Sequence, residues 1–275
     1  PADLGGEGAS MTEIAELCSI LGQACAASAM VFAMHQIKLS SLVEHGAESD
    51  WHRDFMRRIA REQLLLASAT TEGGIGGNLR NSICAIKVEG DTCYLEKDAT
   101  VISYGAHADA ILITSRSHAE AASSDQVLTC FLKDQYEIKR TVEWNTLGMR
   151  GTCSDGFLFK GEAPAKQILP KPFAEIAAQS MLASSHLLWS GVWYGIAADA
   201  VSRAQAFVRA AARKSPGAPP PGALRLAEAS SMLQMVKSNV VAGLKAYEEA
   251  KLDADRLSSM AFAVAMNNVK IASSE

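Results

Sequence analysis

A glycine-rich segment, TTEGGIGGN at residues 70–78, contains the residue types best suited to bind a ligand. Its glycines lack side chains, so their backbone N–H groups can approach a flat or anionic ligand closely. The hydroxyls of Thr70 and Thr71 precede the glycines and can hydrogen-bond the same ligand. The segment therefore favours a ligand-binding loop, although a plain flexible connection has a similar composition.

Two common phosphate-binding motifs do not fit this segment. A P-loop requires Lys followed by Ser or Thr after its last glycine, whereas Asn78 and Leu79 stand there. The dinucleotide fingerprint requires a third glycine where the sequence has Leu79, and no alternation of strands and helices surrounds the segment. The remaining interpretation is a loop that brings bare backbone close to another kind of ligand.

The bulk composition is that of an ordinary folded protein. The chain has 275 residues, of which 48% are hydrophobic and 20% are charged, and both values are usual for globular domains. The net charge is -4, and acidic and basic residues are interspersed along the chain. The sequence has no basic stripe of the kind that binds the phosphate backbone of a nucleic acid. We therefore expect a globular protein of one to three domains and no nucleic-acid partner.

The sequence has no sign of a membrane segment, a disulfide framework or a metal centre. No apolar run approaches the roughly 18 residues that a membrane-spanning helix needs, and the N-terminus lacks the pattern of a signal peptide. The six cysteines are scattered without a CxxC pair, which favours reduced, mostly buried thiols. We therefore expect a cytoplasmic protein with no bound metal. Both ends, PADLGGEGAS and NNVKIASSE, have the appearance of cut ends.

The spacing of apolar residues changes twice along the chain and predicts three domains. Residues 1–63 have helical spacing, residues 64–170 form short β-rich segments, and residues 171–275 return to helical spacing. We therefore predict an N-terminal helical domain, a central β-barrel or β-sandwich domain, and an antiparallel helical bundle that is incomplete.

The same patterns predict the finer elements. Thr12 is the expected cap of the first helix. The segment CYLEKDATVISY predicts one strand over residues 93–104. Two long helices are expected at residues 173–214 and 222–274, separated by the breaker SPGAPPPG.

Three stretches, taken together, resemble the acyl-CoA dehydrogenase family. They are SATTEGGIGGN, TVISYGAHADAILITSR and WNTLGMRGTCSDGFLFKGEAPAKQIL, in that order and spacing. The lead PADLGGEG is also similar to a motif of the family. The likeness covers essentially the whole chain, and it implies the three-part fold described above.

The resemblance implies an FAD cofactor that lies between the β domain and the helical bundle and is completed across a dimer interface. It places Ala69, Thr70 and Thr71 beside the flavin ring, and Ser103 where the family usually has Thr. The further residues implied to bind FAD are Val101 and Ile102 on the second strand, Gly76 and Gly77 in the loop, and Arg213 at the pyrophosphate of the neighbouring subunit. Gly77 and Asn78 are implied to contact the acyl thioester.

The family reaction needs a carboxylate base, which the sequence does not supply at an expected place. In that reaction the base removes the proton α to a thioester, and the flavin accepts a hydride from the β carbon. A minority of members have the base on the first long helix, where Ser185 and His186 align. Ser185 is no carboxylate, and a lone His on an Ala-rich helix is more often a packing residue. Glu72 is expected to support its loop, so the catalytic residue is unassigned.

The resemblance implies FAD-dependent α,β-dehydrogenation of an acyl-CoA or acyl-carrier-protein thioester in fatty acid metabolism. It also implies a homodimer or homotetramer, with a heteromer as the alternative, and an electron acceptor such as an electron-transfer flavoprotein. Two other functions stay open because no base is found. One is a reduced-flavin monooxygenase-like enzyme, and the other is a non-catalytic partner subunit that keeps the fold for assembly.

Overall fold

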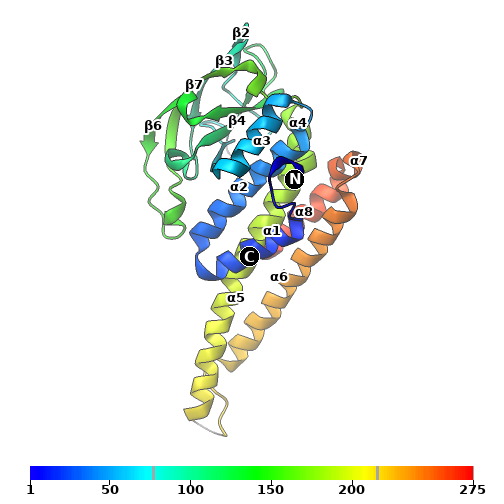
Figure 1. Cartoon of the computed structure of the whole chain (residues 1–275). Coiled ribbons are helices and arrows are strands. Elements are labelled where there is room, and N and C mark those ends of the chain that lie inside the picture. Colours follow the sequence, from blue (N-terminus) through cyan, green and yellow to red (C-terminus); the bar gives the residue numbers. More distant parts are fainter. Residues whose placement is uncertain (76–77, 215–216, 275) are drawn as a thin grey trace. The chain divides into compact units, whose positions relative to one another are not determined.

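The structure is a computed structural model that describes residues 1–75, 78–214 and 217–274 (Figure 1). The chain forms two compact units. The sheet unit consists of residues 1–9 and 34–182 and contains every described strand, and the helical unit consists of residues 10–33 and 183–275. The division into residues 1–63, 64–170 and 171–275 stays a prediction.

Three α-helices precede the first strand, in the region where the helical spacing predicted two or three. They are α1 (Met11–Ala24), α2 (Ala26–His45) and α3 (Asp50–Glu62). Thr12 is not the cap of α1, because the helix begins at Met11 and Thr12 lies inside it. Ser10 is the cap: its hydroxyl accepts from the Glu13 N–H, and its own N–H donates to the Glu13 carboxylate. This reciprocal pair satisfies two backbone groups that would otherwise lack a partner.

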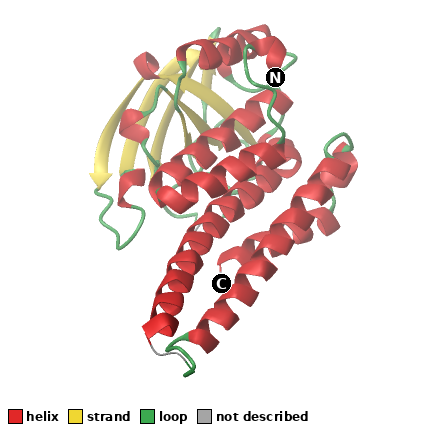
Figure 2. Ribbon diagram, turned by 60° about the horizontal axis from the view of Figure 1, so that its bottom comes forward, coloured by secondary structure: helices red, strands yellow, loops and turns green. Residues whose placement is uncertain are grey.

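Seven described strands form two sheets in the sheet unit, of order β1-β4-β5 and β2-β3-β7-β6. The strands are yellow in Figure 2. The strands are β1 (Leu66–Ala69), β2 (Lys87–Glu89), β3 (Thr92–Ala99), β4 (Ala110–Arg116), β5 (Gln126–Leu132), β6 (Tyr136–Val142) and β7 (Gly156–Pro164). The predicted class is confirmed, but the described strands do not close into a barrel. Phe131 of β5 packs edge-on against Phe159 of β7, with 5.1 Å between ring centroids. The two sheets share this apolar core, which favours the sandwich alternative.

Strand β3 alternates between buried and exposed side chains. Cys93, Leu95 and Ala99 are buried, as expected for the inner face of a sheet. Lys97 occupies the same inner register and is only 3% exposed. A lysine at this position needs a specific reason, because burying an ammonium group is costly unless it is paired.

The strand predicted for residues 93–104 is shorter than expected. It ends at Ala99, so Val101, Ile102 and Ser103 do not lie in a strand. The chain turns at Tyr104, whose φ of 45° is in the left-handed region. Residues typical of a strand, Val101 and Ile102, continue past the true end of β3. The turn that follows them has no strong sequence signal, because the residue with left-handed backbone is not a glycine.

The helical unit contains two long antiparallel helices, α5 (Leu182–Lys214) and α6 (Ala223–Ala250) (Figures 1 and 2). Before α5 come α4 (Phe173–Ile176) and one π-helical turn, Ala177–Met181. The helix expected over residues 222–274 is interrupted after Ala250. It resumes as α7 (Ala254–Ser258) and α8 (Met260–Ser274). Asp253 causes this restart, because its carboxylate accepts from the Arg256 N–H as a helix cap.

Helix α1 lies unusually close to α5 because small residues face each other. A Cβ at Gly191 would stand 2.8 Å from the carbonyl oxygen of Ala15, and one at Gly195 would overlap the carbonyl of Ser19. Helix α1 contributes Gly22 to the same contact, because a Cβ there would stand 2.6 Å from the Val192 carbonyl oxygen of α5. The glycines therefore allow backbone contact between the two helices.

None of the described helices combines the length and the hydropathy of a membrane-spanning helix.

Candidate functional site

The structure joins the three sequence stretches of interest within the sheet unit. The Tyr104 hydroxyl donates to the carbonyl oxygen of Leu66 in β1 at 2.9 Å, and the Thr71 hydroxyl donates to the carbonyl of Val101 at 3.1 Å. The Tyr104 N–H donates to the carbonyl of Thr152 at 2.7 Å. The segments that follow β1, follow β3 and precede β7 therefore form one connected cluster.

Unusual backbone conformations gather in this cluster. The described chain has four non-glycine residues with positive φ, and three of them are Tyr104, Met149 and Cys153. Left-handed backbone at a non-glycine residue costs energy and persists only where the surroundings enforce it. Such residues are most frequent at binding and active sites. The concentration of three in two contacting segments supports a functional role for this part of the sheet unit.

A chain of three buried hydroxyls runs through the cluster. Ser103 lies 2.8 Å from Ser154, which lies 2.8 Å from Thr152, and the Thr152 hydroxyl donates to the Met149 carbonyl at 2.8 Å. A carbonyl only accepts, so the single Thr152 proton is used there. Ser154 must then donate to Thr152, and Ser103 to Ser154. The Ser103 oxygen therefore retains acceptor capacity alone toward any ligand.

The residues predicted to contact the flavin differ in exposure and in free hydrogen-bonding capacity. Thr70 is half-buried and its hydroxyl has no partner among the described residues. Thr71 and Val101 are also half-buried, whereas Ala69 and Ile102 are 0% exposed. Ala69 and Ile102 therefore support the wall of the cluster through packing. The polar groups with capacity left for a ligand include the Thr70 hydroxyl and, as acceptors, the oxygens of Thr71 and Ser103, whose protons are donated within the cluster.

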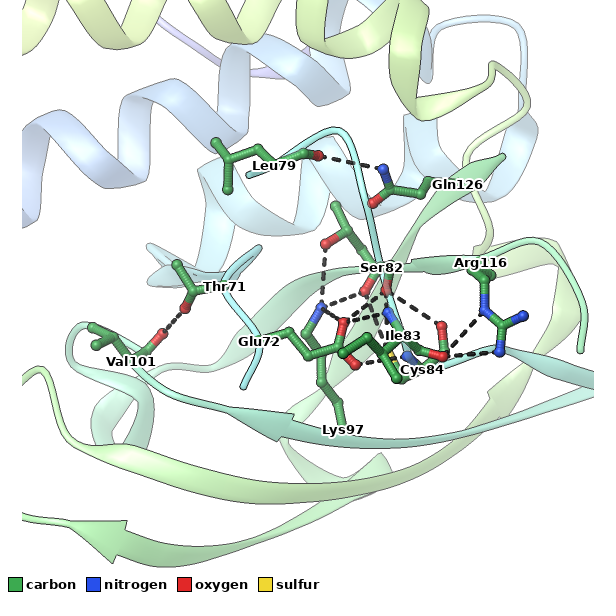
Figure 3. Close-up of polar contacts among 11 residues, drawn as sticks. Thr71, Glu72, Leu79, Ser82, Ile83, Cys84, Lys97, Val101, Arg116 and Gln126 are labelled. Atoms are coloured by element: carbon green, nitrogen blue, oxygen red, sulfur yellow. Dashed lines mark hydrogen bonds and ion pairs between the residues drawn. The ribbon is translucent and has the colours of Figure 1, made fainter. Parts of the chain in front are cut away.

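The start of the glycine-rich segment is fixed by the buried carboxylate of Glu72 (Figure 3). It accepts hydrogen bonds from the Ser82 hydroxyl at 2.8 Å, the Ile83 N–H at 2.9 Å and the Cys84 N–H at 2.6 Å. The Lys97 ammonium lies 3.8 Å away. Glu72 therefore joins the residues before the glycines to those after them, as expected for a residue that supports the loop.

Burial and pairing act in opposite directions on this carboxylate. Burial alone would raise the pKa of Glu72, but the Ile83 N–H, the Lys97 charge and the contacts with Ser82 and Cys84 lower it below the ordinary value. Burial lowers the pKa of Lys97, an effect that Cys84 and Glu72 oppose. The carboxylate is therefore ionised at neutral pH.

The remaining loop residues have their own supports. The Asn78 N–H donates to the carbonyl of Ile75 at 3.0 Å, and the Asn78 side-chain oxygen accepts from the Arg80 N–H at 3.1 Å. The Gln126 amide donates to the Leu79 carbonyl at 3.3 Å. Gly76 and Gly77, the predicted contacts to the flavin and the thioester, lie outside the described residues.

The other predicted residues belong to the helical unit. Arg213 is exposed in the last turn of α5. His186 of α5 is 9% exposed, its Nδ1 has no partner among the described residues, and burial followed by the Lys270 charge lowers its pKa. A buried, neutral imidazole packed near α8 agrees with the expectation that His186 is a packing residue.

Sequence analysis alone did not find Lys97 or the hydroxyl chain. A signal for Lys97 existed, since it falls in the inner register of TCYLEKDA beside Cys93, Leu95 and Ala99. The hydroxyl chain had no comparable signal, because it depends on turns at residues 104 and 149–153. Among the described residues, no group of three or more His, Cys, Asp or Glu side chains could hold a metal ion.

Comparison with known proteins relates the chain to enzymes of one fold. No family model matches the sequence. A curated relative, cyclohex-1-ene-1-carbonyl-CoA dehydrogenase of Geobacter metallireducens, is 25% identical over 171 residues, which are 62% of this chain and 45% of the relative. The chain thus spans about half the length of this curated relative.

Solved structures match almost the whole chain. Butyryl-CoA dehydrogenase from Megasphaera elsdenii has a TM-score of 0.79 at 14% identity, over 98% of this chain and 72% of its own. FMN-bound TdsC from Paenibacillus sp. A11-2 has a TM-score of 0.78 at 18% identity, over 99% and 72%; TdsC is a dibenzothiophene monooxygenase. At these identities the matches establish the fold.

Proposed function

The chain has the acyl-CoA dehydrogenase fold, and from this premise we propose that it binds FAD and serves the α,β-dehydrogenation of an acyl thioester. The observation that supports this most is the connected cluster of three segments in the sheet unit. In it Ser103 directly precedes the left-handed Tyr104, and Thr70 directly precedes Thr71, whose hydroxyl donates to the Val101 carbonyl. A flavin ring has both acceptors and an N–H donor along its polar edge, so it fits the Thr70 hydroxyl and the Ser103 oxygen.

Thr70 and Ser103 would hold the polar edge of the flavin, and the half-buried Val101 would pack against the ring. The flavin would supply the acceptance of a hydride, which no amino-acid side chain can perform. The protein would bind the flavin, orient it and exclude water. Asn78 would approach the substrate from the loop that Glu72 fixes. We propose Gly76, Gly77 and Arg213 as further contacts on the resemblance alone.

Proton removal from the substrate is assigned to no residue of this chain. Ser185 has no carboxylate, and no Asp or Glu occurs on α5 before Asp199. The buried imidazole of His186 has a lowered pKa, which makes it a weak base.

A reduced-flavin monooxygenase-like activity is the second candidate, and three observations favour it. No carboxylate stands at the position of the base on α5, and a monooxygenase is among the solved structures of the same fold. The orientation of the hydroxyl chain also suits it, because an acceptor-only Ser103 pairs better with a reduced flavin, which carries additional N–H groups.

The remaining proposals concern partners and location. We propose a homodimer or homotetramer on the resemblance, and Met232 and Met235, which lie three residues apart on α6 and are each more than half exposed, would suit a subunit contact. An acyl-CoA or acyl-carrier-protein substrate, an electron-transfer flavoprotein as acceptor, a role in fatty acid metabolism and a cytoplasmic location follow from the resemblance.

The absorption spectrum tests this proposal. The purified chain is mixed with FAD, freed of unbound flavin, and then treated anaerobically with short and long acyl-CoA. A flavin band that bleaches supports the dehydrogenase. A band that persists with acyl-CoA, but whose reduced form is consumed by oxygen in the presence of a substrate, supports the monooxygenase. A protein that retains no flavin contradicts both and favours a non-catalytic partner subunit.

A further inference from the structure

We propose that Lys97 is a positioning residue, which acts through Glu72 to hold the two described sides of the glycine-rich loop and so sets the affinity of the site for flavin. The part concerning flavin rests on the proposed function. The part concerning the loop rests on the contacts below and can be tested without any ligand.

Glu72 connects the two sides of the loop. It follows β1 directly, and the groups that donate to its carboxylate, from Ser82, Ile83 and Cys84, come after the glycines (Figure 3). Its side chain is only 5% exposed. Three donors on a buried carboxylate define one position for both sides, because any displacement leaves an N–H group or a charge without its partner.

Lys97 connects the same carboxylate to both sheets. The residue belongs to β3 of the four-stranded sheet, and its ammonium donates to the carbonyl oxygen of Thr114, in β4 of the three-stranded sheet, at 2.7 Å. The same ammonium lies 3.8 Å from the Glu72 carboxylate, and its side chain is 0% exposed. Lys97 thus determines where the loop stands relative to the two strands.

A neutral residue in place of Lys97 would hold the Glu72 carboxylate less firmly. The Glu72 charge would be buried with only dipolar partners if Lys97 were absent, and an uncompensated buried charge weakens the structure around it. Relief is available at the loop, since Ile83 is 56% exposed and Leu79 is 37% exposed. We therefore expect loss of Lys97 to release the loop before it unfolds the sheets.

The loop also carries supports that are independent of Lys97. The Gly73 N–H donates to the carbonyl of Asp98 at 3.2 Å, and the Arg116 guanidinium donates to the carbonyl of Ile83 at 2.9 Å. These contacts keep the segment near the sheets. They do not join its two sides, which are held together by the Glu72 carboxylate and, at the tip, by the Asn78 N–H bond to the Ile75 carbonyl.

The experiment compares Glu72→Gln and Lys97→Met with a matched control. Glu72→Gln preserves the shape of the side chain and the contact between Lys97 and Thr114, so it remains informative if Lys97→Met does not fold. The control is Lys160→Met, which removes the lysine of the exposed Glu96–Lys160 pair on the neighbouring strands β3 and β7. Each protein is assayed for trypsin cleavage after the exposed Arg80, for FAD affinity and for melting temperature.

We expect both test variants to be cleaved after Arg80 about tenfold faster than the wild type, because local opening controls cleavage of a folded protein. We expect their FAD dissociation constants to rise about tenfold. Lys160→Met should behave as the wild type in both assays. In Glu72→Gln, cleavage at other lysines and arginines should change much less than cleavage after Arg80.

Two results would overturn the proposal. One is unchanged cleavage after Arg80 in a folded Glu72→Gln protein, which would show that the carboxylate does not hold the loop. The other is a lowered melting temperature with unchanged FAD affinity, which would reduce Lys97 to a stabilising residue. Failure of the wild type to bind FAD would refute the proposed function and its flavin part, while the cleavage assay would still decide the loop part.

Discussion

The sheet unit and the helical unit use different means to fix their parts. Around Glu72, each position is set by particular charges and hydrogen-bond donors, such as Lys97 at 3.8 Å and the Cys84 N–H at 2.6 Å. In the helical unit, α1 and α5 are set by shape, because glycines such as Gly195 permit backbone contact. The comparison teaches that polar specificity is concentrated in the sheet unit, where the candidate site lies.

Unpaired buried polar atoms occur in both units, but not in the cluster around Glu72. Among the described residues they are His186 Nδ1 and Trp189 Nε1 in the helical unit, and His52 Nε2, Ser115 Oγ and Thr129 Oγ1 in the sheet unit. Around Glu72, by contrast, the carboxylate and the ammonium of Lys97 both have several partners. A buried group without partners is costly but positions nothing. His186 therefore fits a packing role better than a chemical one.

The largest effect should come from removing the buried cation of the sheet unit. Lys97→Met should lower the free energy of unfolding by about 3–5 kcal/mol, because it leaves a buried carboxylate uncompensated. Lys160→Met, on the exposed pair, should change it by less than about 1 kcal/mol. Urea unfolding of both variants measures the difference. Equal effects would show that the polar cluster is no more important than a surface ion pair.

The next largest effect should come from adding a methyl group where α1 and α5 are in backbone contact. Gly195→Ala places a Cβ against the Ser19 carbonyl and should cost about 3 kcal/mol, since backbone contact leaves no side chain to move aside. Gly148→Ala is the matched control, because no atom lies within 4 Å of the added Cβ. Thermal unfolding compares them. A stable Gly195→Ala protein would mean that α1 and α5 are less closely packed than described.

Acidification should weaken the sheet unit through His52. Burial lowers the pKa of this side chain to about 4, against an ordinary value of 6.5. The unfolded chain therefore binds the proton first, so stability is full above pH 6.5 and falls as the pH drops toward 4. Between pH 7.5 and 5 the loss due to His52 should be about 2 kcal/mol.

The contribution of His52 to the loss of stability at low pH can be separated from the contributions of other titrating groups. His52→Asn removes the titrating ring while its amide can still reach the Ser49 hydroxyl, which contacts His52 Nδ1 at 2.8 Å. The difference in pH dependence between wild type and His52→Asn, from urea unfolding at several pH values, gives the His52 contribution. If the unfolding free energy of both proteins depended on pH in the same way, the assignment of this loss to His52 would be contradicted.

The smallest effect concerns the hydroxyl chain. Ser103→Ala should cost about 1 kcal/mol of stability, the usual contribution of one hydrogen bond. Thr152→Val should have a further consequence, because it removes the anchor at Met149 and lets the Ser103 proton point outward. The ratio of affinities for oxidised and reduced flavin should then move toward the oxidised form. A ratio that does not change would separate the hydroxyl chain from flavin binding.

The sequence predicted much of the fold because apolar spacing and helix breakers are local. The strand at Ala110–Arg116 and the helix that ends at Lys214 both follow from such patterns. The break after Ala250 was missed, since Asp253 gains its role as a cap only in the folded chain. The turn at Tyr104, beyond the end of β3, was missed because its left-handed backbone is held by contacts from distant segments.

The candidate site was less predictable than the fold. Thr70, Thr71 and Ser103 were named from motif resemblance, and the structure brings their segments together. Lys97 was overlooked because a charged residue in a strand usually faces solvent. Its role appears only when β3, β4 and the loop after β1 come together in space. Such residues depend on tertiary contacts that residue spacing does not encode.

Titration of the flavin-free chain with FAD, followed by flavin fluorescence, shows whether the Glu72 carboxylate sets the flavin affinity of the site. Wild type and Glu72→Gln are measured side by side, with Glu96→Gln on the exposed pair as the control. We expect saturable, equimolar binding to wild type and control, and about tenfold weaker binding to Glu72→Gln. Absence of binding to the wild type, or equal affinity in all three proteins, would contradict this expectation.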